Sequence, residues 1–414
     1  MGFKLLPVQE TLSTDAIIDK MLGTNKTPSQ ILNVINSCFS GKPYTKDYVL
    51  ARKKKLQKYR KTLEYLLTLP KIDQRTEEWY AVRNTIITAS EFAQALDKAK
   101  FGTQKQFYKK KCGLDQTINL SSPPLIWGIK YEPVASAIYS KRTGQIIHEF
   151  GLLRHPTIPF FGASPDGITN NGIMVEFKCP YARTITGDVP LQYYYQMQGQ
   201  LSVCDLEECD YVECGLIEVA DLGEMWEQCH SECGIIIERN NVKTYSPVFS
   251  PGEEEQAKLW LSQNGYRKEV EAEQGSESQV AEAEQNNIVE SKDVVESKDV
   301  VESKDAVESK DVVESKDVVE SKDAVESKDV VETGNIGEED VVEQTITYWV
   351  LKHYNTVRIY RDDAFLQGQF ALLEPIWAKV CEYRQDPSEL TTKRKERGGG
   401  SESKTEYMFI DDPN

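Results

Sequence analysis

The chain has 414 residues, a formal net charge of −17 and nine cysteines. This length is enough for one large domain or two ordinary ones with a buried core. No apolar run reaches the roughly 18 residues that a membrane-spanning helix needs, and the first residues lack the basic-then-apolar order of a signal peptide. Because the cysteines form no regular framework, they indicate a reducing compartment. We therefore expect a soluble, intracellular protein.

The net charge is divided unevenly along the chain. Residues 1–200 hold 27 Lys and Arg against 16 Asp and Glu, a net charge of +11, whereas residues 201–414 hold 22 against 50, a net charge of −28. A basic half suits a polyanion such as nucleic acid, because Lys and Arg that neutralise phosphates release counterions. The run ARKKKLQKYRK at 51–61 is the densest example, and the alternative is that it forms only the solvated face of a helix.

Helices dominate the start of the chain, and a mixed pattern follows. Apolar residues recur at three-to-four spacing before Pro70, and helices then alternate with short strands, which predicts an α/β or α+β fold with a central mixed sheet flanked by helices. The predicted divisions are a helical region (1–70), the first part of the core (71–250), an acidic insertion (251–343), two strands and a helix that complete the core (344–386), and a flexible tail (387–414).

Several elements of the core have definite predicted ends. A short helix is expected at 77–82, and a capped start at Thr88–Glu91 leads into another helix. Residues 127–144 are predicted to form a helix closed by Gly144. Residues 191–204 (LQYYYQMQGQLSVC) predict a partly buried helix, and residues 210–219 (DYVECGLIEV) predict a strand.

The insertion contains a hexapeptide repeat. Residues 288–329 are seven consecutive copies of [I/V/A]-V-E-S-K-D, each with a net charge of −1. A period of six matches neither a helical stripe nor an alternating strand, so we expect this segment to stay solvated and disordered. Its sign is wrong for binding DNA. We favour an inert repeat expansion; the alternatives are that it limits nonspecific binding or acts as a tether.

The stretch ASPDGITNNGIMVEFKCP at 163–180 carries the strongest chemical signal. Its Asn170-Asn171-Gly172 run predicts a hairpin turn, and strand alternation then puts Glu176 and Lys178 on one face, with Asp166 across from them. Opposed carboxylates are costly without a cation, so they indicate a divalent-metal site, for which Mg²⁺ is suited. Lys178 could hold or deprotonate an attacking water. The alternative is an ordinary exposed hairpin with a lysine-carboxylate pair.

Four motifs in order extend this reading: VRNTIITASEF, WGIKYE, SPDG and VEFKCP. Together they resemble the lambda-type exonuclease and YqaJ-type viral recombinase family, which has the PD-(D/E)xK restriction-endonuclease-like fold. The resemblance covers about residues 75–219 and, more weakly, 345–383. Unlike the compact exonuclease members, this chain has an additional N-terminal helical region (1–70) and an acidic insertion (251–343).

The resemblance implies roles for individual residues. Asp166 and Glu176 would bind the metal together with the Phe177 carbonyl, and Lys178 would serve the nucleophilic water. Glu132 matches the helical acid that binds or orients a second metal. Gln198 matches a glutamine that faces the active centre, with Gln196 as its neighbour in the pattern, although a plain amphipathic helix would explain both.

The same resemblance gives a site for a terminal phosphate. Arg83, Thr88 and Ser90 match the segment that grips the 5′-phosphate in exonuclease members, and an arginine fork beside hydroxyls at a helix start suits that task. The alternative for Arg83 is a structural salt bridge.

These features predict a metal-dependent deoxyribonuclease that uses one or two Mg²⁺ ions, or Mn²⁺ in their place. Its expected activity is 5′-to-3′ digestion of double-stranded DNA ends, in the cytoplasm or nucleus of an infected cell if the source is viral. An endonuclease or flap-type nuclease on the same site and a non-catalytic DNA-binding protein are the alternatives. The resemblance also implies a single-strand annealing protein as partner and a homo-trimeric ring. No G-x4-G-K-[ST] loop indicates ATP use, and Cys229, His230 and Cys233 do not form a paired zinc motif.

Overall fold

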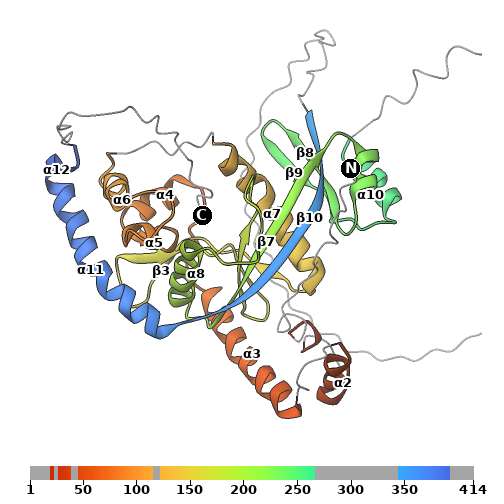
Figure 1. Cartoon of the computed structure of the whole chain (residues 1–414), viewed down its shortest axis with the longest axis horizontal. Helices are drawn as coiled ribbons and strands as arrows, with labels where there is room; N and C mark the ends of the chain where they lie inside the picture. Colours follow the sequence, from red (N-terminus) through yellow and green to blue (C-terminus); the bar gives the residue numbers. More distant parts are fainter. Residues whose placement is uncertain (1–18, 23–26, 39–44, 115–121, 266–343, 392–414) are drawn as a thin grey trace, which may run out of the picture. The chain divides into compact units, whose positions relative to one another are not determined.

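A seven-stranded mixed sheet is the centre of the computed structural model, in which β7 and β10 run side by side (Figure 1). The strand order is β2-β5-β6-β7-β10-β8-β9, and only the β6–β7 pair among them is parallel. The strands are β2 (Ile147–His148), β5 (Gly167–Thr169), β6 (Met174–Lys178), β7 (Glu208–Val219), β8 (Cys233–Arg239), β9 (Val242–Tyr245) and β10 (Gln344–Tyr360).

The structure describes residues 19–22, 27–38, 45–114, 122–265 and 344–391. All of them lie in one unit, which joins 1–265 to 343–414. None of the helices in these ranges is long and apolar enough to cross a membrane.

Helices and a small second sheet surround the large sheet. The small sheet has the order β1-β4-β3, with β1 (Ile87–Thr88), β3 (Leu153–Arg154) and β4 (Phe161–Ala163). The helices are α2 (Pro28–Cys38), α3 (Lys46–Leu66), α4 (Glu77–Asn84), the 3-10 helix η1 (Ala89–Glu91), α5 (Phe92–Ala95), α6 (Gln104–Lys111), α7 (Pro123–Thr143), α8 (Leu191–Cys204), α9 (Leu222–Gln228), α10 (Glu254–Gln263), α11 (Asp363–Gln385) and α12 (Ser388–Thr391).

The two faces of β6 belong to different hydrophobic cores. Val175 and Phe177 pack in a cluster with residues of α7, whereas Met174 packs in a cluster with residues of α5, α8 and α11. Because side chains alternate along a strand, Glu176 and Lys178 lie on the same face as Met174, which is the face that α8 covers. All five residues of β6 are buried.

Most predicted elements of the core are confirmed. The helix α8 has the predicted ends, and α7 ends at Gly144, whose φ of 68° is the left-handed conformation that favours glycine. The predicted hairpin is formed by β5 and β6. The α/β fold class with a mixed sheet and flanking helices is therefore confirmed.

Two expectations differ from the structure. The region after residue 344 forms one strand of 17 residues, β10, and not two. The strand β7 pairs along it through Asn355, which faces Glu213. The expected insertion began at 251, whereas α10 lies at Glu254–Gln263. The hexapeptide repeat and the tail after residue 391 lie outside the described residues.

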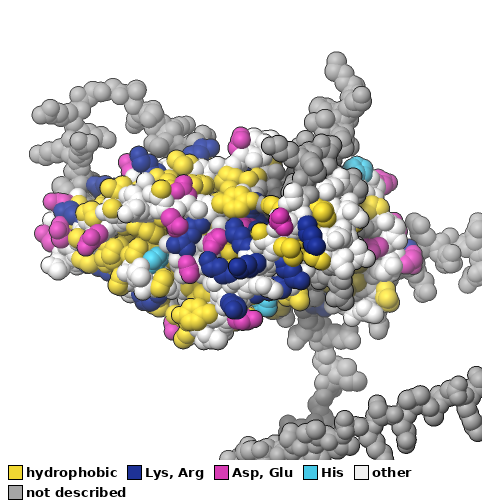
Figure 2. Space-filling view, turned by 90° about the horizontal axis from the view of Figure 1, so that it is seen from below, with side chains coloured by type: hydrophobic (Ala, Val, Ile, Leu, Met, Phe, Trp, Pro, Cys, Tyr) yellow, Lys and Arg dark blue, Asp and Glu magenta, His cyan; other side chains and the backbone are white. Residues whose placement is uncertain are grey.

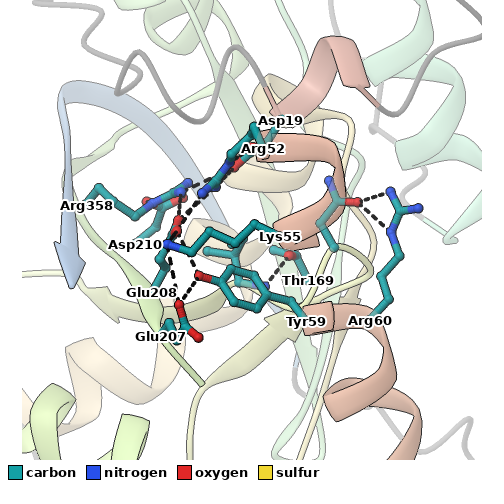
Figure 3. Close-up of polar contacts among 12 residues, drawn as sticks. Asp19, Arg52, Lys55, Tyr59, Arg60, Thr169, Glu207, Glu208, Asp210 and Arg358 are labelled. Atoms are coloured by element: carbon teal, nitrogen blue, oxygen red, sulfur yellow. Dashed lines mark hydrogen bonds and ion pairs between the residues drawn. The ribbon is translucent and has the colours of Figure 1, made fainter. Parts of the chain in front are cut away.

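The helix α3 is attached to the sheet by a buried ionic cluster (Figure 3). Arg52 bonds both Asp19, at 2.6 Å, and Glu208, at 2.5 Å. Arg358 of β10 lies 2.6 Å from Glu208 and 2.5 Å from Asp210. Burial alone would raise the pKa of Glu208, but the hydrogen bond from Arg52 and the charge of Arg358 hold it below its usual range. The cluster thus joins the N-terminal helices to the first residues of β7.

The basic run at 51–61 is therefore divided between two roles. Lys55 and Lys58 pair with Glu207 or Glu208, as Arg52 does, and Arg60 donates to Asn171. Lys53, Lys54 and Lys61 remain exposed. Lys and Arg side chains gather near the middle of the face seen from below, with acidic side chains among them (Figure 2). Several cations of α3 thus anchor this helix to the core. The run is therefore neither wholly a surface for nucleic acid nor wholly the solvated face of a helix.

Candidate active site

The hairpin turn is shaped both by its own backbone and by α3. Gly172 has a φ of 75°, and its N–H donates to the Thr169 carbonyl at 2.7 Å. A Cβ atom on Gly172 would lie 2.6 Å from the Tyr59 carbonyl oxygen, so α3 packs directly on the turn. Arg60 adds a 2.6 Å bond to the Asn171 side chain. Glycine is required here for its conformation and for this close approach.

The hairpin brings Asp166, Glu176 and Lys178 together, as the sequence predicted. The Oδ2 of Asp166 accepts a hydrogen bond from the Phe177 N–H at 2.8 Å, which places this carboxylate beside the middle of β6. Lys178 Nζ lies 2.8 Å from Glu176 Oε1 and 5.0 Å from the centre of the Tyr193 ring. Glu176 and Lys178 are 0% and 1% exposed, so this is no solvated surface pair.

Two glutamines of α8 hold the Glu176 carboxylate. Gln196 Nε2 donates to Oε1 at 2.6 Å, and Gln200 Nε2 donates to Oε2 at 2.8 Å. Residues four apart share one face of a helix, whereas a residue two positions away points to the other side. Gln198 accordingly bonds the Tyr360 carbonyl and the Asp362 N–H, each at 2.8 Å. The structure thus does not bring Gln198 to the carboxylates, and Gln200, which the sequence reasoning missed, lies there instead.

Asp166 is strongly perturbed by its surroundings. Burial raises the pKa of this carboxyl well above its usual range, and the neighbouring charges of Glu176 and Glu132 raise it further. Lys178 and the Phe177 N–H act in the opposite direction. A cation placed between the carboxylates would relieve this repulsion.

Glu132 lies at the edge of the group. Its Oε2 is 2.9 Å from Arg75 Nη2, and its side chain is 24% exposed. In the part of the chain that the structure describes, no three His, Cys, Asp or Glu side chains are arranged to hold a metal ion together. Asp166 and Glu176 therefore form the central pair, and the negative charge of Glu132 acts on this pair by raising the pKa of Asp166.

The donor set fits a hard divalent cation. In a strand, the N–H and C=O of one residue point the same way, so the Phe177 carbonyl points toward Asp166, as its N–H does. Two carboxylates and a carbonyl are oxygen ligands of the kind that Mg²⁺ accepts, with waters and a substrate phosphate completing its shell. The Phe177 carbonyl thus points to the side on which it would bind a metal ion together with Asp166, as the family resemblance implies.

Arg83, Thr88 and Ser90 lie together at the start of η1. Arg83 Nη2 is 3.2 Å from Ser90 Oγ, and the hydroxyls of Thr88 and Ser90 are 3.1 Å apart. The guanidinium of Arg83 stacks over the Trp79 ring at 4.1 Å. Trp79 Nε1 in turn donates to Ser164, two residues before Asp166, at 3.0 Å. The Trp79 side chain therefore connects this group to the segment between β4 and β5 that carries Asp166.

The sequence reasoning missed the charges beneath this group. The buried Glu91 carboxylate lies 2.6 Å from Lys111 Nζ and 3.1 Å from Lys110 Nζ, and it accepts bonds from the Thr88 N–H and hydroxyl. Burial would raise the pKa of Glu91, but Lys111 and its neighbours hold it far below its usual range. Burial lowers the pKa of Lys111 to about 8. Two features of the sequence could have indicated this cluster. One is the run KKK at 109–111, and the other is Glu91, the acid three residues after the capping residue Thr88.

A further buried carboxylate lies next to Lys178. Glu213 faces Lys178 in the β6–β7 register. It lies 2.7 Å from Arg183 and accepts a bond from the Tyr211 hydroxyl at 2.9 Å. Both contacts involve the same oxygen, Oε1, while Asn355 donates to Oε2. Glu213 therefore fixes the chain after β6, and the alternation in DYVECGLIEV places it on the active-site face.

The chain is similar to several known proteins. Residues 78–207 match the family model of the YqaJ-like viral recombinase domain. An uncharacterized protein of Acanthamoeba polyphaga mimivirus, R354, is 29% identical over 183 residues, which are 40% of this chain and 32% of that relative. The chain thus matches about a third of the length of this curated relative.

A solved structure is also similar. The alkaline exonuclease LHK-Exo from Laribacter hongkongensis is 35% identical, and the match covers 33% of this chain and 73% of that one, with a TM-score of 0.30. The same exonuclease in complex with dAMP gives the same identity and coverage, with a TM-score of 0.31. Because both TM-scores are low, the likeness rests on the sequence.

Proposed function

We propose that this chain, which belongs to the YqaJ-type and lambda-type exonuclease family, is a metal-dependent deoxyribonuclease that digests double-stranded DNA from its ends. The observation that carries this proposal is the buried group of Asp166, Glu176 and Lys178, in which Gln196 and Gln200 fix one carboxylate and a backbone N–H fixes the other. A surface hairpin would need no such support.

The carboxylates and the Phe177 carbonyl would hold Mg²⁺, or Mn²⁺ in its place, as one or two ions. When bound, the ion supplies Lewis-acid polarisation of the phosphate and lowers the pKa of a coordinated water. The raised pKa of the Asp166 carboxyl supports this assignment. A carboxylate that is buried beside two other carboxylates is stabilised by a nearby cation. Glu132, paired with Arg75, would orient ligands of a second ion at the edge of the site.

Lys178 would act on the attacking water and on the phosphate. Its ammonium is held by Glu176 and by the Tyr193 ring, which fixes its position before substrate binds. The Lys178 ammonium would orient the attacking water by donating a hydrogen bond to it. The water oxygen would form a bond to phosphorus as the bond to the leaving oxygen breaks in line with it; the water proton would pass to solvent, and the leaving oxygen would take up a proton from solvent. The ammonium would offset negative charge on the phosphate in the transition state.

The group of Arg83, Thr88 and Ser90 would bind the terminal 5′-phosphate and so give the 5′-to-3′ direction. Arg83, Lys110 and Lys111 are three cations around the single carboxylate of Glu91, which leaves a net positive charge. Two hydroxyls lie beside Arg83, and a phosphate accepts bonds from such donors.

The proposed partners are duplex DNA ends and a single-strand annealing protein that would take the 3′ strand, with a homo-trimer suggested by family resemblance. An end-resecting exonuclease produces the single strand that such a partner needs.

The test compares three substrates: 5′-phosphorylated linear duplex, the same duplex without its phosphates, and closed circular DNA, each with Mg²⁺ and with EDTA. We expect Mg²⁺-dependent loss of the phosphorylated linear DNA, abolished by Lys178→Ala. Nicking of the circle would instead favour an endonuclease, and DNA binding without cleavage in Mg²⁺ or Mn²⁺ would make the protein a binding module.

A further inference from the structure

An aromatic pair lies just beyond the end of β6. Tyr181 follows Lys178 by three residues, and 52% of its surface is exposed. Its ring meets Trp127 of α7 edge to face, with centroids 5.5 Å apart and an interplanar angle of 69°. Trp127 in turn packs on Tyr131 at 4.4 Å. An exposed tyrosine thus rests on two further rings.

The segment that carries Tyr181 is fixed on both sides. Before it, the Cys179 thiol donates to the Tyr131 carbonyl, with 3.4 Å between sulfur and oxygen. After it, Arg183 pairs with the buried Glu213 at 2.7 Å. The ring is therefore supported in one place and does not belong to a loose surface loop.

This pair lies near the end of the strand that carries Glu176 and Lys178. Three residues of extended chain span at most about 11 Å, so Tyr181 lies within that distance of the Lys178 backbone. Tyr131, which supports Trp127, is the neighbour of Glu132 on α7. Trp127 and Tyr131 belong to the cluster on the other face of β6 from Glu176 and Lys178, so Tyr181 lies past the end of this strand, within reach of a nucleotide attached to a phosphate at Asp166 and Glu176.

The chemistry of the pair suits a nucleic-acid base. An exposed ring held by others offers a flat face, and every base can stack on such a face without regard to sequence. Trp127 lies between the Tyr181 and Tyr131 rings and so keeps the exposed ring in place.

We propose that Tyr181, supported by Trp127, is a stacking platform for the base next to the phosphodiester that is cut. This inference rests on the proposed nuclease function, because it assigns a contact to the substrate of the same site. Tyr181 positions the nucleotide and takes no part in the proton transfer. Tyr181 should therefore stack on any base and contribute little to the binding of an abasic nucleotide.

A binding assay tests the platform without cleavage. Duplex DNA with 2-aminopurine at the 5′-terminal nucleotide is titrated with protein that carries Lys178→Ala, alone or combined with Tyr181→Ala, Tyr181→Phe or Tyr65→Ala. Tyr65 is a matched control because it is 63% exposed and lies on α3. Stacking predicts quenched fluorescence in all proteins except the one with Tyr181→Ala. Equal quenching in all four would overturn the proposal.

A kinetic assay then separates stacking from general damage. Stacking a base on an aromatic ring corresponds to roughly a 5- to 150-fold effect. We expect Tyr181→Ala, in the otherwise wild-type chain, to lower kcat/KM by that factor on normal DNA and to cause no loss on DNA with an abasic nucleotide next to the cut. Tyr181→Phe should match wild type. An equal loss on both substrates would contradict the stacking role.

The two assays also separate this inference from the proposed function. If wild type cuts no DNA but fluorescence still depends on Tyr181, the platform stands and the nuclease proposal fails. If wild type cuts DNA and Tyr181→Ala changes neither readout, the nuclease proposal stands and the platform fails.

Discussion

The two glutamines of α8 give a sharp test of the site, because a third glutamine on the same helix serves as a control. Gln196→Leu removes a 2.6 Å hydrogen bond from the Glu176 carboxylate, whereas Gln198→Leu removes bonds only to Tyr360 and Asp362. Hydrogen bonds to a charged group contribute about 1.5–3 kcal/mol each. Losing an outer partner of a metal ligand typically costs roughly 10- to 100-fold in metal affinity.

We therefore expect Gln196→Leu to raise the Mg²⁺ concentration for half-maximal DNA cleavage by about 10- to 100-fold. Gln198→Leu should leave that concentration unchanged and lower the free energy of unfolding by about 1–3 kcal/mol, because it removes two partly buried hydrogen bonds to the backbone. A Mg²⁺ titration of the cleavage rate, with calcium binding by calorimetry as a second readout, measures the first effect. Urea unfolding measures the second. The reasoning is wrong if Gln198→Leu weakens metal binding while Gln196→Leu does not.

Two more predictions concern other groups. Arg83→Gln should lower kcat/KM about 10- to 150-fold on 5′-phosphorylated linear duplex and leave the rate on 5′-hydroxyl duplex unchanged, since one charged contact to phosphate is lost; equal losses on both would refute a phosphate role. Arg52→Met should lower the free energy of unfolding by about 3–5 kcal/mol, because it leaves Asp19 and Glu208 buried without their main partner. Arg52 and Arg358 hold the pKa of Glu208 below its unfolded value of about 4.3, so this stability is present above that pH and is lost as the pH falls further. The difference between wild type and Arg52→Met in urea unfolding should shrink between about pH 5 and 2, and a constant difference would contradict the assignment.

Local patterns predicted the hairpin and the helix ends well, because the determining residues are neighbours in the chain. Asn170, Asn171 and Gly172 form the turn through their own backbone preferences, and Gly144 ends α7 in the same way. Strand alternation then placed Glu176 and Lys178 on one face.

Features that depend on distant segments could not be read from the sequence. Gln198 was assigned to the active centre by resemblance, whereas Gln196 and Gln200 make the contact; the helical period alone does not say which face of α8 meets a carboxylate. The cations of α3 were expected to face DNA. Several of them instead form ion pairs with Glu207 and Glu208, about 150 positions later in the chain. The single strand β10 likewise depends on pairing with β7 and β8 on its two sides.

The most direct test of the central claim measures Mn²⁺ binding and DNA cleavage in the same titration, for wild type, Asp166→Asn and Lys178→Met. Mn²⁺ binding is followed by electron paramagnetic resonance, and cleavage by release of labelled nucleotides from 5′-phosphorylated duplex. We predict that Asp166→Asn loses both signals, whereas Lys178→Met keeps Mn²⁺ binding and loses cleavage. Unchanged Mn²⁺ binding in Asp166→Asn, or cleavage at the wild-type rate in Lys178→Met, would contradict the assignment of the hairpin as the nuclease site.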